Sequence, residues 1–224
     1  MLRSIKELQG YTIDASDGEI GKLHEFFFDD NRWEIRYMVV DTGNWLKGRR
    51  VLVAPQAFGP VDRGAQRLPV TLSRAQVEQS PPVEADKPLS RRLEDALLAY
   101  YEWHQPHKTG ARERVDTDLR STREVIGYHI QARNGEIGHL DDMIVEEKGW
   151  LIRYLIIDTR NWLPGKKVLL PPAWAEAIRW AERKVLIDLK RETIEHSPEF
   201  DPDQPLDRDY EVRFYDYYDR PKYW

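Results

Sequence analysis

The chain has 224 residues, with 34 basic and 39 acidic side chains and a net charge of −5 at pH 7. This length allows one large domain or two small ones, because about 100 to 200 residues per domain is usual. The absence of cysteine excludes disulfides, thiolate metal sites and a cysteine nucleophile, and the acidic balance provides no general attraction for nucleic-acid phosphates.

The first hundred residues predict a β-rich unit that ends in short helices. Residues 34–42, EIRYMVVDT, form a nearly continuous apolar run, which indicates a strand buried on both faces. A turn, GNWLKG, separates this run from RRVLVAP, so the two runs predict a hairpin. Ser73 and Ser90 are candidate N-caps of helices that begin after them.

The second half repeats this order. The predicted strands are 151–159 and 166–172, the turn between them reads RNWLPG, and Asp207 is the candidate N-cap of a last helix. At an offset of 117, residues 10–57 align with 127–174 without a gap, and 22 of the 48 pairs are identical. The chain therefore contains a repeat of about 100 residues.

We predict two domains with a linker between them. Residues 106–122 are polar and poor in apolar side chains, which is typical of an exposed linker. Residues 1–105 and 123–224 are then the two units. Each has about six short strands and no long helix between them, which favours a mainly β fold of two small closed barrels, each followed by a short helical segment.

The motifs resemble those of the PRC-barrel family. Gly-Tyr-x-Ile is followed by Asp/Asn-Gly-Glu-Ile-Gly-x-Leu, then by an apolar strand that ends in Asp-Thr, and then by Val-Leu-x-x-Pro. This is the fold of the cytoplasmic domain of the photosynthetic reaction-centre H subunit and of the C-terminal domain of a bacterial ribosome-maturation factor. The resemblance covers residues 3–80 and 120–197 and implies a tandem binding or assembly protein without a catalytic role.

The residues themselves predict neither a catalytic nor a metal centre. Paired carboxylates occur at Asp29-Asp30, Asp141-Asp142 and Glu146-Glu147, but no nucleophile or further ligand converges on them in the pattern. Asp41 and Asp158 end buried strands, where we expect them to accept backbone N–H groups of the following turns. The histidines lack the spacing of a zinc site. We therefore expect no enzyme activity and no cofactor.

Trp45 and Trp162 are the candidate partner-binding residues that the turns do not explain. A turn is satisfied by Asn and Gly, so these rings, with Leu46 and Leu163, either plug their own barrels or are buried against another domain or subunit. Tyr223 and Trp224 end an aromatic C-terminal segment, RFYDYYDRPKYW, which either packs on its own domain or anchors a partner. We predict the partner-binding role for all six residues.

The expected function is a non-enzymatic protein-interaction or assembly module. A protein partner or self-association as a homo-oligomer is expected. The alternative is a ribosome- or RNA-associated maturation factor. The basic residues of the two tryptophan loops would then hold phosphates: Lys47, Arg49 and Arg50, and again Lys166 and Lys167. Nucleic-acid binding is the weaker reading because both halves are net acidic. No apolar run spans a bilayer and the N-terminus lacks a secretory signal, so a cytoplasmic protein is expected.

Overall fold

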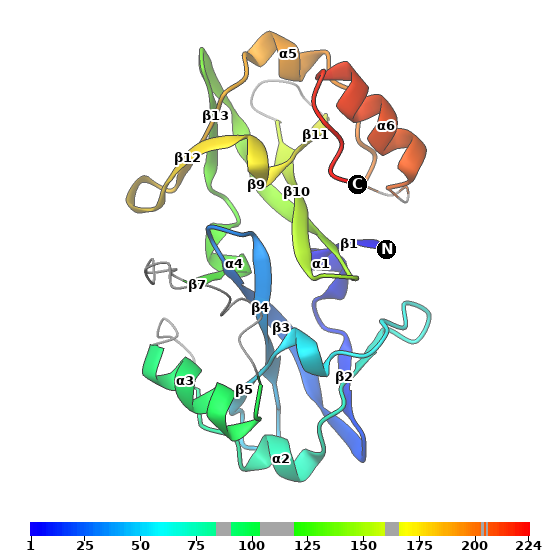
Figure 1. The fold of residues 1–224 in the computed structure, drawn as a ribbon, viewed down its shortest axis with the longest axis vertical. Helices are drawn as coiled ribbons and strands as arrows, with labels where there is room; N and C mark the ends of the chain where they lie inside the picture. The colour runs from blue at the N-terminus through cyan, green and yellow to red at the C-terminus, as the bar shows by residue number, and fades with distance from the viewer. Residues whose placement is uncertain (84–90, 104–118, 160–165, 203, 205) are drawn as a thin grey trace. The chain divides into compact units, whose positions relative to one another are not determined.

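The computed structural model describes residues 1–83, 91–103, 119–159, 166–202, 204 and 206–224, and these form two compact units (Figure 1). The N-terminal unit comprises residues 7–123, and the C-terminal unit comprises residues 1–6 together with 124–224. Each unit therefore includes a short segment that is continuous in sequence with the other. Two four-residue helices, α1 (Ile5–Leu8) and α4 (Thr122–Val125), span these junctions.

The N-terminal unit is built on an antiparallel series of strands. β2 pairs with β3, β3 with β4 and β4 with β5, while β6 pairs with β2 in parallel and β7 with β3 in antiparallel orientation. The strands are β2 (Thr12–Ala15), β3 (Gly18–Asp29), β4 (Glu34–Asp41), β5 (Arg50–Val53), β6 (Arg67–Pro69) and β7 (Leu119–Ser121). The helical elements are η1 (Pro55–Ala57), α2 (Arg74–Glu78) and α3 (Arg91–Tyr100).

The C-terminal unit repeats this plan and adds one strand. β8, β9, β10 and β11 pair in sequence, β13 pairs with β8 in parallel, β12 pairs with β13, and β1 pairs with β9. The strands are β8 (His129–Ala132), β9 (Gly135–Glu146), β10 (Leu151–Asp158), β11 (Lys167–Leu170), β12 (Ala175–Arg179), β13 (Lys184–Ile187) and β1 (Leu2–Ser4). The helical elements are η2 (Pro172–Trp174), η3 (Trp180–Glu182), α5 (Arg191–Glu195) and α6 (Arg208–Tyr217).

The predicted hairpins are confirmed. β4 pairs with β5 and β10 with β11, and β10 is buried at every position of its second half, as the continuous apolar run predicts. The helix starts are also confirmed: Ser73 forms a capping box with Gln76, and the Asp207 side chain accepts the Tyr210 N–H. Ser90 lies outside the described residues.

Two aspects of the prediction differ from the structure. Among the described residues the strand pairings do not return to their starting strand, so closed barrels are not confirmed. Residues 119–121, expected in the linker, form β7 on the edge of β3. Three residues are too few to show the alternation of a strand. The position of β7 is instead determined by its pairing with the distant strand β3. The division into independently folding domains stays a prediction.

The last helix of each unit packs on the central strands of that unit. In the C-terminal unit, Phe214 and Tyr215 of α6 join a cluster with Tyr154 and Ile156 of β10. Figure 1 shows α6 and the C-terminal end (red) beside β10 and β11 of the same unit. In the N-terminal unit, Leu97 of α3 is buried among residues of β4 and β5. The helical extensions are thus parts of the cores.

A glycine in each unit permits the close crossing of two strands. A Cβ on Gly138 of β9 would lie 2.0 Å from the carbonyl oxygen of Asp158, and a Cβ on Gly21 of β3 would lie 2.1 Å from that of Asp41. Both glycines have positive φ, +146° and +147°. The second glycine of the Gly-Glu-Ile-Gly motif is therefore required by the backbone at the end of the apolar strand.

Candidate functional site

The loop that carries Trp45 is closed by the Asp-Thr pair at the end of β4. The Thr42 hydroxyl donates to the carbonyl oxygen of Arg49 at 2.6 Å, and the Gly43 N–H donates to Asp41 Oδ1 at 2.9 Å. The expectation that Asp41 accepts a backbone N–H is confirmed. In the C-terminal unit the Thr159 hydroxyl donates to the carbonyl oxygen of Lys166 at 2.6 Å, at the positions 117 residues further on.

Trp45 itself is half-buried and lies against α2. The guanidinium carbon of Arg74 is 4.6 Å from the centre of its ring, a cation–π contact within the N-terminal unit. Leu46 is also half-buried. The structure thus gives the Trp45 ring a neighbour on its own unit and leaves part of it accessible. Trp162 and Leu163, the other predicted loop residues, lie outside the described residues.

Arg49 and its counterpart Lys166 donate hydrogen bonds to backbone carbonyl oxygens of their own units. Arg49 donates from Nη1 to the carbonyl oxygen of Glu78 at 2.7 Å and from Nη2 to that of Ser80. Lys166 makes the corresponding bonds from Nζ, to the carbonyl oxygens of Glu195 and, at 3.1 Å, of Ser197. These two cations therefore fasten the loop to the end of the following helix, which reduces their capacity to bind phosphate.

Tyr223 and Trp224 fold onto the C-terminal unit. The Tyr223 hydroxyl donates to Glu211 Oε1 at 2.8 Å, and the Arg153 guanidinium lies 4.2 Å from the centre of its ring. Trp224 stays 48% exposed, with the Arg208 guanidinium 4.0 Å from its ring centre. Trp224 thus lies partly exposed on the surface of this unit, in contact with an arginine.

Beneath this surface lies a buried carboxylate that the sequence analysis missed. Glu211 is 2% exposed, and its Oε1 accepts the hydroxyls of both Tyr154, at 2.7 Å, and Tyr223. Its Oε2 is 3.1 Å from Nη1 of Arg208. Burial, followed by the neighbouring Tyr215 and by Glu211, raises the pKa of Tyr154, so its phenol remains a donor. The network fixes α6 and the chain end to β10.

The corresponding pair in the N-terminal unit is Tyr37 and Glu94, whose oxygens are 3.2 Å apart. These residues lie 117 positions before Tyr154 and Glu211. The sequence contained one indication of this network: a tyrosine and a glutamate, in separate elements, both recur at the offset of the repeat. Without the repeat, the tyrosine is an ordinary strand residue and the glutamate an ordinary surface residue.

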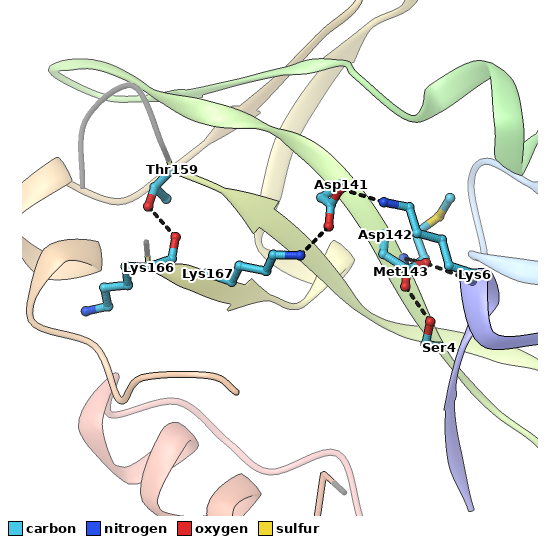
Figure 2. Close-up of polar contacts among 8 residues, drawn as sticks. All are labelled: Ser4, Lys6, Asp141, Asp142, Met143, Thr159, Lys166 and Lys167. Atoms are coloured by element: carbon cyan, nitrogen blue, oxygen red, sulfur yellow. Dashed lines mark hydrogen bonds and ion pairs between the residues drawn. The ribbon is translucent and has the colours of Figure 1, made fainter. Parts of the chain in front are cut away.

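The neighbouring carboxylates Asp141 and Asp142 of β9 have opposite environments (Figure 2). Asp141 is held by two ammonium groups, Lys6 Nζ at 2.5 Å from Oδ1 and Lys167 Nζ at 2.7 Å from Oδ2. Asp142 is 5% exposed and accepts the Ser4 hydroxyl and the Lys6 N–H, the latter at 3.1 Å. The pair therefore binds residues 1–6.

The two pKa values move in opposite directions. Burial raises the pKa of Asp142 above 3.8, and its hydrogen bonds, led by the one from Ser4, only partly oppose this. Burial also tends to raise the pKa of Asp141, but hydrogen bonds and charges of Lys167 and Lys6 outweigh it, so that pKa lies below 3.8. Among the described residues no group of three or more histidine, aspartate or glutamate side chains is arranged to hold a metal ion.

We expect Asp142→Asn and Asp141→Asn to change the pH dependence of unfolding in opposite ways. With its raised folded-state pKa, Asp142 stabilises the fold fully below pH 3.8, and this contribution is lost as the pH rises through the folded-state pKa. Asp141 stabilises above pH 3.8, and this contribution is lost as the pH falls through its lowered pKa. Urea unfolding at a series of pH values measures both. Parallel curves for Asp142→Asn and the unchanged protein would contradict the assignment.

The comparison with known families assigns the fold of one part of the chain. The match extends from the segment that contains β7 through β8, the β9–β10 hairpin and β11 to β13 and α5. Residues 118–194 match the PRC-barrel domain. PRC-barrel domains often mediate protein interactions, so the match is consistent with an interaction or assembly module. No protein with a curated description matches the chain. Within the described residues, every helix is too short or too polar to span a bilayer.

Proposed function

We propose that the protein is a non-enzymatic interaction and assembly module made of two PRC-barrel units in tandem. The matched domain supports one unit. The second is supported by bonds that recur at an offset of 117: Tyr37 with Glu94 as Tyr154 with Glu211, and Thr42 with Arg49 as Thr159 with Lys166. The proposal includes the reaction-centre H-like architecture, a cytoplasmic location and association into a homo-oligomer.

The observation that carries this proposal is the surface formed by Arg208, Tyr223 and Trp224, which contact one another. Arginine, tyrosine and tryptophan are the residues that most often dominate binding energy at interfaces. Trp224 is 48% exposed and already contacts Arg208 and Tyr223, so a partner can bury it with little further loss of side-chain freedom. The half-buried Trp45 with Arg74 is a second surface that pairs a tryptophan with an arginine.

The RNA-associated alternative has less support. Arg49 and Lys166, two of the cations next to the tryptophan loops, are bonded to carbonyl oxygens of their own units. Lys167 is paired with Asp141. A phosphate-binding role would require these contacts to be exchanged, and the net charge of −5 gives no compensating attraction.

We expect Trp224→Ala to weaken association about thirtyfold, and Trp45→Ala combined with Trp162→Ala to weaken it at least as much. Truncation of an interface tryptophan commonly costs about 2 kcal/mol or more, which corresponds to this factor. Sedimentation measures self-association, and capture from a native extract followed by mass spectrometry identifies a protein partner. Ribosomal particles in the captured material would favour the alternative function.

Trp180→Ala is the matched control, because Trp180 contacts Tyr128 and belongs to neither surface. It should leave association unchanged. The melting temperature separates an interface from a core role: if the variants at positions 45, 162 or 224 melt far lower while association is unaffected, these rings pack the fold and the interface proposal is wrong.

A further inference from the structure

Each compact unit is completed by a segment from the other half of the chain. Residues 1–6 belong to the C-terminal unit, although the chain continues from Glu7 within the N-terminal unit. Residues 119–123 belong to the N-terminal unit, although the chain continues from Glu124 within the C-terminal unit. The PRC-barrel match begins at residue 118, so the matched domain includes the segment that in the fold completes the other unit.

The two segments bind in the same register. β1 pairs with β9 through Leu2–Glu146, Arg3–Val145 and Ser4–Ile144. β7 pairs with β3 through Leu119–Asp29, Arg120–Phe28 and Ser121–Phe27. The donor residues of the second set lie 117 positions after those of the first, and the acceptor residues lie 117 positions before. Both donor segments have the sequence Leu-Arg-Ser. The backbone ladders on the two acceptor strands are therefore equivalent.

Buried carboxylates recognise the serine of each segment. The Ser4 hydroxyl donates to Asp142, which is 5% exposed, and the Ser121 hydroxyl donates to Glu25, which is 7% exposed. Figure 2 shows Ser4 and Lys6 at Asp142. Because a buried carboxylate without donors is costly, either acceptor strand favours a serine at this position.

The carboxylate that directly follows each acceptor strand pairs with the arginine of the segment. Arg3 pairs with Glu147, and Arg120 Nε lies 3.1 Å from Asp30 Oδ2. The recognised sequence is thus Leu-Arg-Ser, read by a backbone ladder, an acidic partner for the arginine and a buried carboxylate for the serine. These contacts of the Leu-Arg-Ser sequence do not distinguish the two segments. The residue two positions after each serine does, because Lys6 pairs with Asp141 whereas Arg123 contacts His24.

We propose that residues 1–6 are an exchangeable strand donor and that the protein self-associates by inserting them into the C-terminal unit of a second copy. This rests on the self-association in the proposed function and names its partner and its contact. Exchange between copies retains every donor–acceptor contact described above, so the balance depends on protein concentration and on the connecting segment. A three-residue ladder also opens at lower cost than the whole unit.

The cysteine-free chain allows a direct test with single cysteines. Leu2 and Glu146 are Cα partners in an antiparallel pair, a separation that suits a disulfide. One full-length preparation carries Leu2→Cys and another carries Glu146→Cys, and the two are mixed at high concentration under mild oxidation. A disulfide between these positions can then form only between copies.

The mismatched control is Glu136→Cys, also on β9 but paired with Gln131 of β8. It lies ten residues from position 146, about 33 Å along a strand. We expect at least tenfold more mixed disulfide dimer with Glu146→Cys than with Glu136→Cys. Adding Ser4→Val to the Leu2→Cys chain should lower that yield about tenfold, because the bond to the buried carboxylate is lost.

A chain with both Leu2→Cys and Glu146→Cys reports pairing within one copy. Internal disulfides in this chain together with equal dimer yields from the matched and mismatched mixtures would overturn strand exchange. So would the absence of both internal and mixed disulfides. If the unchanged protein still associates in sedimentation in either case, the assembly function stands and uses another surface.

Discussion

Gly138→Ala is expected to destabilise the C-terminal unit by about 3 kcal/mol or more. The new Cβ would lie 2.0 Å from the carbonyl oxygen of Asp158, which belongs to backbone and cannot rotate away. The positive φ of +146° adds strain for any residue with a side chain. Chemical denaturation, followed by circular dichroism and tryptophan fluorescence, measures the loss.

Gly127→Ala is the matched control in the same unit. Gly127 also has positive φ, +87°, but a Cβ there meets nothing within 4 Å. It should cost about 1 to 2 kcal/mol, the conformational penalty alone. Equal losses for the two substitutions would mean that β9 and β10 do not approach as closely as described.

Glu211→Ala is expected to cost about 2 to 4 kcal/mol, because it removes the acceptor of two tyrosine hydroxyls, whereas its other partner, Arg208, is exposed and can be solvated. Tyr154 is 1% exposed, so its buried hydroxyl would lose the acceptor that Glu211 provides. The chain end should also loosen, since Tyr223 is bonded to the same oxygen. Denaturation measures the first effect, and hydrogen exchange of the backbone amides of residues 222–224 follows the second.

The equivalent substitution in the N-terminal unit, Glu94→Ala, is the control. The Glu94 side chain is 18% exposed and accepts the Tyr37 hydroxyl at the longer distance of 3.2 Å, so we expect a loss of about 1 kcal/mol. If Glu94→Ala costs as much as Glu211→Ala, burial is not what makes the C-terminal network strong.

Local pattern was sufficient for the hairpins and the helix starts. A continuous apolar run followed by a turn predicts β4 with β5, and Ser73 as an N-cap residue predicts the start of α2. These features depend on neighbours in sequence. The same reasoning predicts an Asp41 side chain that closes its own turn, as observed.

The contacts that complete the units depend on residues far apart in the chain. Ser4 is 138 positions from Asp142, and Ser121 is 96 positions from Glu25. Glutamate and aspartate are almost never fully buried unless they are paired, so a sequence alone favours exposed positions for Glu25, Asp142 and Glu211. The repeat was the signal that could have identified them. Glu25 and Asp142 occupy equivalent positions of the two copies, and Glu211 is equivalent to Glu94.

The connection of the two units sets an order of events during synthesis. The β3 edge of the N-terminal unit leaves the ribosome long before residues 119–121, its partner in the finished fold. Residues 2–4 carry the same Leu-Arg-Ser sequence and have already been made, while their own acceptor β9 does not yet exist. A Leu-Arg-Ser segment is therefore already present in the nascent chain when β3 is made, well before residues 119–121 and β9.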